Sequence, residues 1–316
     1  MARKIVIVGS GGRLGAALVR EWRAGGDEVL GFNRALLDLS DFAQVREVLG
    51  NLEFDALVNC AAQTNVDRCE REPEEAFRIN SGAVATLADV CARKKARCVH
   101  ISTDYVFDGT QREPYTEEDE PRPISKYGES KWSGERCLHA VADRHLAVRV
   151  SWIFGPDRPS FVDQILQRAL EEERVSAIAD KFSVPTYTLD AARLLRPLVA
   201  DNAIDGVLHV CNRGECSWKE YGQHALDCAA EMGLPLRART VEPLALAEMK
   251  DFVAPRPVYS VLGTDKLTRL TGLTPRPWQE AVRDYIRTHW TVERCRPSPT
   301  LSSREPVDPG RDERSS

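Results

Sequence analysis

The chain has 316 residues, of which 42% are hydrophobic and 29% are charged, and its formal net charge is −5. A chain of this length can bury a large core, so one large domain or two closely packed domains are expected. The acidic balance argues against a nucleic-acid partner. No apolar run approaches the roughly 20 residues of a membrane span and no signal-peptide pattern is present, so we expect a cytoplasmic protein without a membrane partner.

The cysteines and histidines show no pattern typical of a metal site or a disulfide framework. Nine cysteines are scattered without a Cys-x-x-Cys pair, and the six histidines have no metal-ligand spacing. An odd number of unpaired cysteines is typical of reduced thiols in a cytosolic enzyme. We therefore expect neither disulfides nor a bound metal.

Short apolar segments alternate with helical patterns through the first half of the chain. The predicted strands are 4–8, 28–32, 56–60, 97–103 and 146–153, and the predicted helices are 12–24, 43–49, 73–95 and 124–141. Strands that alternate with helices predict parallel β-α-β units with right-handed crossovers. The predicted fold class is therefore α/β, a doubly wound parallel sheet with a smaller C-terminal substrate domain.

The alternation loosens after residue 155. Helices are predicted at 161–172, 190–200, 217–232 and 278–289. We predict a dinucleotide-binding domain over residues 1–155, with strands returning to it near 174–179 and 206–212. Residues 156–292 would mainly form the substrate-binding domain. Residues 293–316 contain almost no large apolar side chain, which predicts a disordered tail.

A glycine-rich turn follows the first predicted strand and opens the first helix. It reads VGSGGRLG at residues 8–15, with glycines at 9, 12 and 15. Glycine permits the tight turn and lets the backbone approach a pyrophosphate at the helix N-terminus. The strand-turn-helix context predicts a Rossmann domain that binds a nicotinamide dinucleotide.

The residues after the second strand bear on the choice of cofactor. An acidic residue there would bind the adenosine ribose, but this chain has Asn33 and Arg34. The planar guanidinium of Arg34 could pair with a 2′-phosphate, which favours NADPH and leaves NADH open. A solvated surface role for Arg34 is the alternative. Asp38 and Leu39 could meet the adenine, and Asp38 could equally cap a helix.

Tyr127 and Lys131 lie four residues apart in a predicted helix and would share one face. An ammonium beside a phenol lowers the pKa of the phenol from about 10, so that it can exchange a proton with a carbonyl group. Thr103 and Asp104 lie at the end of an apolar strand. Beside a dinucleotide-binding fold, these residues predict a carbonyl reductase. Alone, the pair could be a solvated helix face and Thr103 a cap.

Together these residues resemble the extended short-chain dehydrogenase/reductases, and more narrowly the dTDP-4-dehydrorhamnose reductase family. The resemblance covers about residues 3–290. The segments that carry it are 9–15, 59–67, 100–109, 114–117, 127–131, 149–155, 183–187 and 256–262. The glycines have the three-then-three spacing of short-chain dehydrogenase/reductases, and the run STDYVFDG at 102–109 is the most family-specific segment.

The resemblance implies NAD(P)H-dependent reduction of the C4 ketone of dTDP-4-dehydro-6-deoxy-L-mannose to dTDP-L-rhamnose. Tyr127 would donate the proton, Lys131 would hold the nicotinamide ribose and tune Tyr127, and Thr103 would bind the substrate oxygen. Asp104 and Trp152 match substrate-binding positions, although Trp152 could simply be core. The cofactor-binding set, from the residues and the resemblance together, is Gly9, Gly12, Arg13, Leu14, Gly15, Arg34, Asp38, Leu39, Ala62, Gln63 and Thr64, with Tyr127 and Lys131.

Several alternatives remain open. Asn80 could reach the cofactor or make a local backbone hydrogen bond. The enzyme could be another reductase or epimerase of nucleotide-activated sugars. A different class is the NADP-binding regulatory subunit of methionine adenosyltransferase, which resembles this family and would bind cofactor without turnover. The sequence also leaves a homodimer open.

Overall fold

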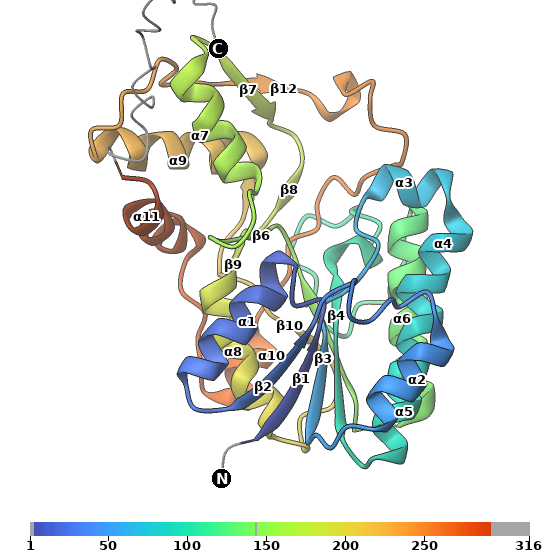
Figure 1. The fold of residues 1–316 in the computed structure, drawn as a ribbon. Coiled ribbons are helices and arrows are strands. Elements are labelled where there is room, and N and C mark those ends of the chain that lie inside the picture. The colour runs from blue at the N-terminus through green and yellow to red at the C-terminus, as the bar shows by residue number, and fades with distance from the viewer. Residues whose placement is uncertain (1–2, 143, 292–316) are drawn as a thin grey trace, which may run out of the picture.

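A six-stranded parallel sheet forms the centre of the computed structural model, which describes residues 3–142 and 144–291 (Figure 1). The strand order is β10-β5-β4-β3-β1-β2, and all neighbours run parallel. The strands are β1 (Lys4–Val8), β2 (Glu28–Phe32), β3 (Ala56–Asn59), β4 (Arg97–Thr103), β5 (Leu146–Val150) and β10 (Gly206–His209). The α/β class with a doubly wound parallel sheet is confirmed.

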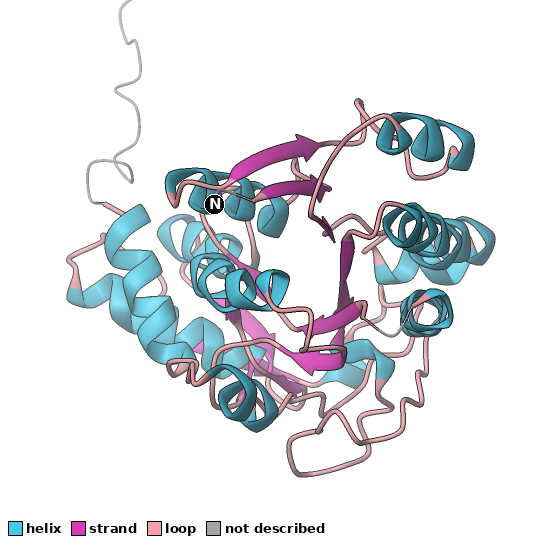
Figure 2. Ribbon diagram, turned by 90° about the horizontal axis from the view of Figure 1, so that it is seen from below, coloured by secondary structure: helices cyan, strands magenta, loops and turns pink. Residues whose placement is uncertain are grey.

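Helices cover both faces of this sheet (Figure 2). On one face lie α1 (Arg13–Ala24) and α8 (Thr188–Ala200), and on the other lie α2 (Phe42–Gly50), α5 (Ala83–Arg93) and α6 (Lys126–Val141). Leu14, Leu18 and Trp22 recur every four residues, so they form one buried face of α1 against the sheet. No helix in the described ranges is long and apolar enough to cross a membrane.

A second group of elements lies at the carboxyl edge of the strands (Figure 1). It contains α7 (Phe161–Glu171), α9 (Trp218–Glu231), α11 (Trp278–His289) and the strand pair β7 (Val175–Ile178) and β12 (Val241–Leu244). The predicted return of 174–179 to the central sheet is wrong, because this strand pairs with β12 and buries Val175 and Ala177 in a separate core. The strand at 206–209 does join the sheet, beside β5.

Shorter elements complete the described chain. They are α3 (Val66–Arg71), α4 (Pro73–Phe77), α10 (Asp265–Thr271), β6 (Ile153–Phe154), β8 (Phe182–Ser183), β9 (Thr186–Tyr187), β11 (Cys216–Ser217) and 3-10 turns at Asp104–Val106 and Leu246–Glu248. The division of domains at residue 155 stays a prediction. The tail at 293–316 lies outside the described residues.

The single helix predicted at 73–95 is interrupted by a π-turn at Arg78–Gly82. Asn80 sits in this turn, and its side-chain oxygen accepts from the backbone N–H of Gln63 at 2.8 Å. Its amide nitrogen donates to the carbonyl oxygen of Gln63 at 3.1 Å and to the Ser130 hydroxyl at 2.9 Å. The local backbone hydrogen bond expected of Asn80 is therefore not seen, since its side chain joins a distant loop to α6, and a contact with the cofactor stays a prediction. Such turns recur at functional sites.

The strand predicted at 146–153 also breaks, between Val150 and Ile153. Trp152 has a φ of 36°, which is a left-handed conformation that a bulky residue rarely adopts. The neighbouring Ser151 hydroxyl donates to the carbonyl oxygen of Val184 at 2.6 Å. The chain therefore turns out of the sheet at the carboxyl end of β5, next to the residues predicted to bind substrate.

A buried ion pair fixes α6 against β5. Arg149 donates to both carboxylate oxygens of Glu135, at 3.0 and 2.8 Å, and both side chains are 3% exposed. Removing one partner of such a pair leaves a charge without a partner in the interior. We expect Glu135→Ala to lower the free energy of unfolding by about 3–5 kcal/mol, measured by urea denaturation.

The matched control for this prediction is Glu172→Ala. Glu172 also pairs with an arginine, Arg168, but both side chains are nearly half exposed. Exposed pairs of this kind contribute little to stability because water and salt screen the two charges. If Glu135→Ala and Glu172→Ala lower the free energy of unfolding equally, the buried pair has no special stabilising role.

Candidate active site

A cavity of about 820 Å³ opens at the carboxyl ends of β1, β2 and β3. This edge of a doubly wound sheet is where such folds bind nucleotides, and the volume suits a large ligand. Ten predicted cofactor residues line it, namely Gly9, Gly12, Arg13, Leu14, Arg34, Asp38, Leu39, Ala62, Gln63 and Thr64. The other three predicted cofactor residues, Gly15, Tyr127 and Lys131, do not line the cavity.

Side chains at two positions of the glycine turn would collide with neighbouring backbone atoms. Gly9 has a φ of 85°, and a Cβ there would lie 2.7 Å from the backbone nitrogen of Ala61. A Cβ at Gly15 would overlap the carbonyl oxygen of Gly9. Gly12 precedes the first residue of α1, so its turn lies at the positive end of the helix dipole. The turn therefore fits the pyrophosphate of a dinucleotide.

The polar residues after β2 have separate roles. Arg34 is exposed and lines the cavity, whereas the Asn33 side chain accepts from the backbone N–H groups of Ala35 and Leu36. Asp38 accepts from the backbone of Ser40, and this hydrogen bond lowers the pKa of its carboxyl group. The alternative role of Asp38 as a helix cap is wrong, because Asp41 caps α2.

Arg13 lines the same cavity, but its guanidinium is already bonded. It donates to the carbonyl oxygens of Arg158 and Pro159, which lie in the loop after β6. Arg20, two turns further along α1, pairs with Asp157 of the same loop. These contacts fix the loop to α1 and bring Arg158 to the edge of the cavity. Arg158 was missed from the sequence because its segment has no motif of its own.

Tyr127 and Thr103 lie together at the carboxyl end of β4. The Thr103 hydroxyl lies close to the Tyr127 phenol, and the ring of Tyr127 meets Tyr105 edge-on at 5.5 Å. Removal from water raises the pKa of Tyr127 above 10, and the nearby Thr103 hydroxyl only partly offsets this. The expectation that Lys131 lowers this pKa is wrong for this structure, because the surrounding protein disfavours the phenolate more strongly.

Lys131 is 2% exposed, on the buried face of α6. Its Nζ donates to the carbonyl oxygen of Ile101 at 2.6 Å and lies 2.9 Å from Nε2 of His100. Burial lowers the pKa of Lys131 to about 7. Cys60, which lines the cofactor cavity, is close enough to Lys131 to feel its charge. Lys131 therefore packs against β4 and does not itself line the cofactor cavity.

Asp104 is 2% exposed and bonded within the protein. One carboxylate oxygen accepts from Ser183 at 3.1 Å and Ser260 at 2.5 Å, and the other accepts from Thr103 at 3.1 Å. Burial raises the pKa of Asp104, and the nearby ammonium of Lys181 opposes the shift. Asp104 thus orients Thr103 and joins β4 to two later segments.

Lys181 is fully buried beside Asp104 and was not singled out from the sequence. Its Nζ donates to the carbonyl oxygen of Pro257 at 2.8 Å and lies over the rings of Tyr105 and Trp152. Burial lowers the pKa of Lys181 to about 8. The signal in the sequence is a lysine two residues before the matched segment 183–187, but only the fold brings it near Asp104.

Trp152 packs against Trp218 and Tyr221, with ring centroids 5.7 and 6.3 Å away. Its indole N–H is buried and has no hydrogen-bond partner among the described residues. The core packing anticipated as an alternative is therefore present.

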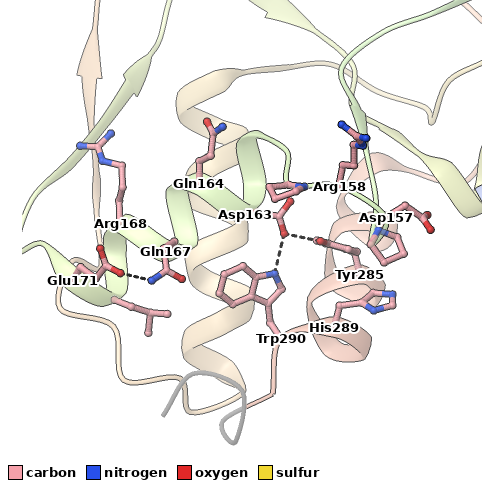
Figure 3. Close-up of a pocket in the computed structure, with 13 residues that line it drawn as sticks. Asp157, Arg158, Asp163, Gln164, Gln167, Arg168, Glu171, Tyr285, His289 and Trp290 are labelled. Carbon is pink, nitrogen blue, oxygen red and sulfur yellow. Dashed lines mark hydrogen bonds between the residues drawn. The ribbon is translucent and has the colours of Figure 1, made fainter. Parts of the chain in front are cut away.

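A second cavity, of about 940 Å³, lies between α7 and α11 (Figure 3). Tyr285 and Trp290 both donate to the carboxylate of Asp163, and Gln167 bonds Glu171. None of the predicted catalytic or cofactor residues lines this cavity. Because its polar groups are largely paired with one another, the smaller cavity at the glycine turn is the better candidate site.

Comparisons with known proteins agree with this geometry. The family model described as "RmlD substrate binding domain" matches residues 3–290. A dTDP-4-dehydrorhamnose reductase of Mycolicibacterium smegmatis is 35% identical over 90% of this chain and 86% of its own length. A dTDP-4-keto-6-deoxy-D-glucose reductase of Streptomyces niveus is 33% identical over 96% of this chain and all of its own.

A solved structure is similar over the same range. The dTDP-4-dehydrorhamnose reductase of Bacillus anthracis, in complex with NADP, is 31% identical and covers 91% of this chain and 100% of its own, with a TM-score of 0.85. The family match and these relatives each span nearly the whole described chain. The chain therefore belongs to the RmlD substrate binding domain family, the family of the dTDP-4-dehydrorhamnose reductases.

Proposed function

We propose that this protein is an NADPH-dependent reductase that converts the C4 ketone of dTDP-4-dehydro-6-deoxy-L-mannose to dTDP-L-rhamnose. The observation that carries the proposal is that Thr103, the last residue of β4, lies close to Tyr127 of α6, while Lys131 of α6 bonds β4, at the edge of the sheet where the cofactor cavity opens. The named relatives and the NADP complex of the B. anthracis enzyme support the same substrate class and cofactor.

The residues would divide the work as follows. The backbone of Gly9 and Gly12 would receive the pyrophosphate, and Arg34 the adenosine 2′-phosphate. When bound, NADPH supplies the hydride. Thr103 would hold the ketone oxygen beside Tyr127, whose hydroxyl donates the proton. A raised pKa keeps the Tyr127 phenol protonated at neutral pH, which is the form that reduction requires.

Nicotinamide oxidation by the purified protein tests the proposal directly. We expect turnover of dTDP-4-dehydro-6-deoxy-L-mannose with NADPH, and slower turnover with NADH. Faster turnover of dTDP-4-keto-6-deoxy-D-glucose would move the protein toward the activity named for its Streptomyces relative. Tight NADPH binding without turnover of either sugar would favour a regulatory subunit. A cytoplasmic location and a homodimer stay predictions.

Tyr127→Phe tests the proton donor. The phenylalanine keeps the ring contact with Tyr105 but removes the hydroxyl, so we expect kcat to fall by about 10²–10⁴-fold. Affinity for NADPH, measured by fluorescence titration, should stay nearly unchanged. Tyr285→Phe is the control, because it removes a phenol in the other cavity. Full activity in Tyr127→Phe would contradict the assignment.

Arg34→Ala tests the cofactor preference. Loss of a charge-assisted contact to a 2′-phosphate should weaken NADPH by about tenfold or more and leave NADH nearly unaffected. Dissociation constants for both cofactors provide the measurement. Arg93→Ala, at an exposed ion pair on α5, controls for the loss of a surface charge. Equal losses for NADPH and NADH would remove the 2′-phosphate assignment.

Lys131→Met tests the energetic cost of the buried lysine. In the folded protein the pKa of Lys131 is about 7, below the ordinary 10.5. Between pH 7 and pH 10.5 the unfolded chain therefore binds more protons than the folded protein, so the contribution of Lys131 to the free energy of unfolding rises with pH over this range. Methionine cannot be protonated, so it removes the cost of neutralising or burying the ammonium. We expect Lys131→Met to be inactive, yet more stable than the parent by roughly 2 kcal/mol at pH 6 and not at pH 10.

The same unfolding curves contain an internal reference. Burial also lowers the pKa of Lys181, and this residue remains in the Lys131→Met variant. Part of the pH dependence of the unfolding free energy should therefore persist in the variant. If the difference in unfolding free energy between Lys131→Met and the parent does not change with pH, protonation of Lys131 carries no energetic cost in the folded protein.

A further inference from the structure

The side chain of Arg158 lies beside the glycine turn, although this residue belongs to the loop after β6. A Cβ atom placed on Gly11 would lie 4.0 Å from Nη2 of Arg158, which is an ordinary contact distance. Arg158 also lines the cofactor cavity together with Gly9 and Gly12. Two segments that are remote along the chain therefore meet where backbone N–H groups at the start of α1 can receive a phosphate.

Contacts with α1 fix the backbone of this loop. Arg13, the first residue of α1, donates to the carbonyl oxygen of Arg158 at 3.0 Å and also to that of Pro159. Arg20, further along the helix, pairs with Asp157. None of these contacts uses the guanidinium of Arg158. The backbone of Arg158 is therefore held in place while its side chain remains available for another partner.

The cofactor cavity gathers more positive charge than its carboxylates balance. Among the described residues that line it, four are arginines and one is acidic, namely Arg13, Arg34, Arg68, Arg158 and Asp38. Arg68 pairs with two nearby glutamates, and Arg13 is bonded to the loop. The guanidinium groups of Arg34 and Arg158 bond to no group of the described chain. Burial lowers the pKa of Arg13 and the charge of Arg158 adds to this shift, so an anion beside both would relieve their repulsion.

Two phosphate groups of NADPH could attract Arg158, and their places in a fold of this kind differ. The 2′-phosphate belongs to the adenosine ribose, which binds beyond the end of the second strand, where this chain has Arg34. The pyrophosphate binds at the N-terminus of the first helix, where this chain has Arg13 and the glycine turn. The loop of Arg158 is bonded to this helix, which favours the pyrophosphate.

The sugar nucleotide also carries a pyrophosphate, but the structure places its reacting end elsewhere. Thr103 and Tyr127, which would hold the ketone, lie together at the carboxyl end of β4. In the sheet, β3 separates β4 from β1, the strand that leads into the glycine turn. The cofactor is therefore the favoured source of the phosphate.

We propose that Arg158 is a cofactor-binding residue whose guanidinium pairs with the pyrophosphate of the nicotinamide dinucleotide. The planar fork of N–H donors on an arginine matches two phosphate oxygens, and the glycine turn offers backbone donors to others. Arg158 and Arg34 would thus divide the phosphates of NADPH between them. The assignment rests on the proposed function for the class of cofactor but not for the identity of the sugar.

Ligand binding to Arg158→Ala tests the proposal without turnover. NADPH, NADH and ADP-ribose all contain a pyrophosphate, so we expect each dissociation constant, measured by calorimetry, to rise about tenfold or more. Adenosine 2′-monophosphate and dTDP should bind the variant and the parent equally. Unchanged dissociation constants for NADH and ADP-ribose would overturn the proposal. A loss confined to ligands with a 2′-phosphate, or to dTDP, would also overturn it, because each result assigns Arg158 to a different phosphate.

Arg168→Ala is the matched control for this experiment. Arg168 lines the other cavity and pairs with Glu172 at the surface, so its loss should not change the affinity for NADH. Arg158→Lys keeps the charge but loses the planar fork, and it should recover part of the affinity. Higher ionic strength should weaken NADH binding to the parent more than to Arg158→Ala, because the screened attraction is missing from the variant. Equal salt dependence in the two proteins would contradict a charge contact.

Asp157→Asn tests how the loop positions Arg158. Loss of the ion pair with Arg20 should raise the dissociation constant for NADH in the parent but not further in Arg158→Ala, because both changes act through one contact. Equal effects in the two backgrounds would contradict this role of the loop. A protein that binds ADP-ribose through Arg158 yet turns over no sugar nucleotide would refute the proposed reductase and keep the assignment of Arg158.

Discussion

The close approach of α6 to β4 and to the π-turn is the constraint on which the site depends. A Cβ at Gly128 would overlap the carbonyl oxygen of Tyr105, and a Cβ at Gly134 would overlap that of Asn80. With no side chain between the backbones, the polar groups of α6 are pressed into the interior. Lys131 and Glu135 are almost entirely buried, and each is bonded to a neighbouring strand.

This desolvation determines the protonation states at the site. Water is the main stabiliser of charged side chains, so its exclusion favours a neutral phenol at Tyr127 and a neutral amine at Lys131. A protonated Tyr127 suits a reaction that delivers a proton to a ketone.

The cofactor side of the site follows a different principle. There the backbone rather than charged side chains would bind the cofactor. The glycine turn at 9–15 offers backbone N–H groups and lets a pyrophosphate approach the chain closely. The arginines are unequal in this setting. Arg13 is occupied by two backbone carbonyls and fixes the loop after β6, whereas Arg34 is exposed at the cavity and available for a phosphate group.

The sequence by itself determined the sheet, the glycine turn and the identity of the chemical groups. Strands 4–8, 28–32 and 97–103 were predicted with the bounds the structure has, because local apolar patterns decide such elements. Short strands and turns at 78–82, 151–152 and 182–187 depended on contacts with distant residues, which no local pattern contains. The return of 174–179 to the sheet was mispredicted for the same reason, since its partner β12 lies more than sixty residues away.

For the site, the sequence named Thr103, Tyr127, Lys131 and ten residues of the cofactor cavity, from its motifs and from the family resemblance. Only the tertiary structure brought Lys181 to Asp104 and His100 to Lys131, because these contacts join segments that are remote along the chain. The tertiary structure also reversed the expected direction of the pKa shift of Tyr127. The physical reason is that spacing shows which groups can meet, whereas protonation depends on how much water the folded protein excludes from them.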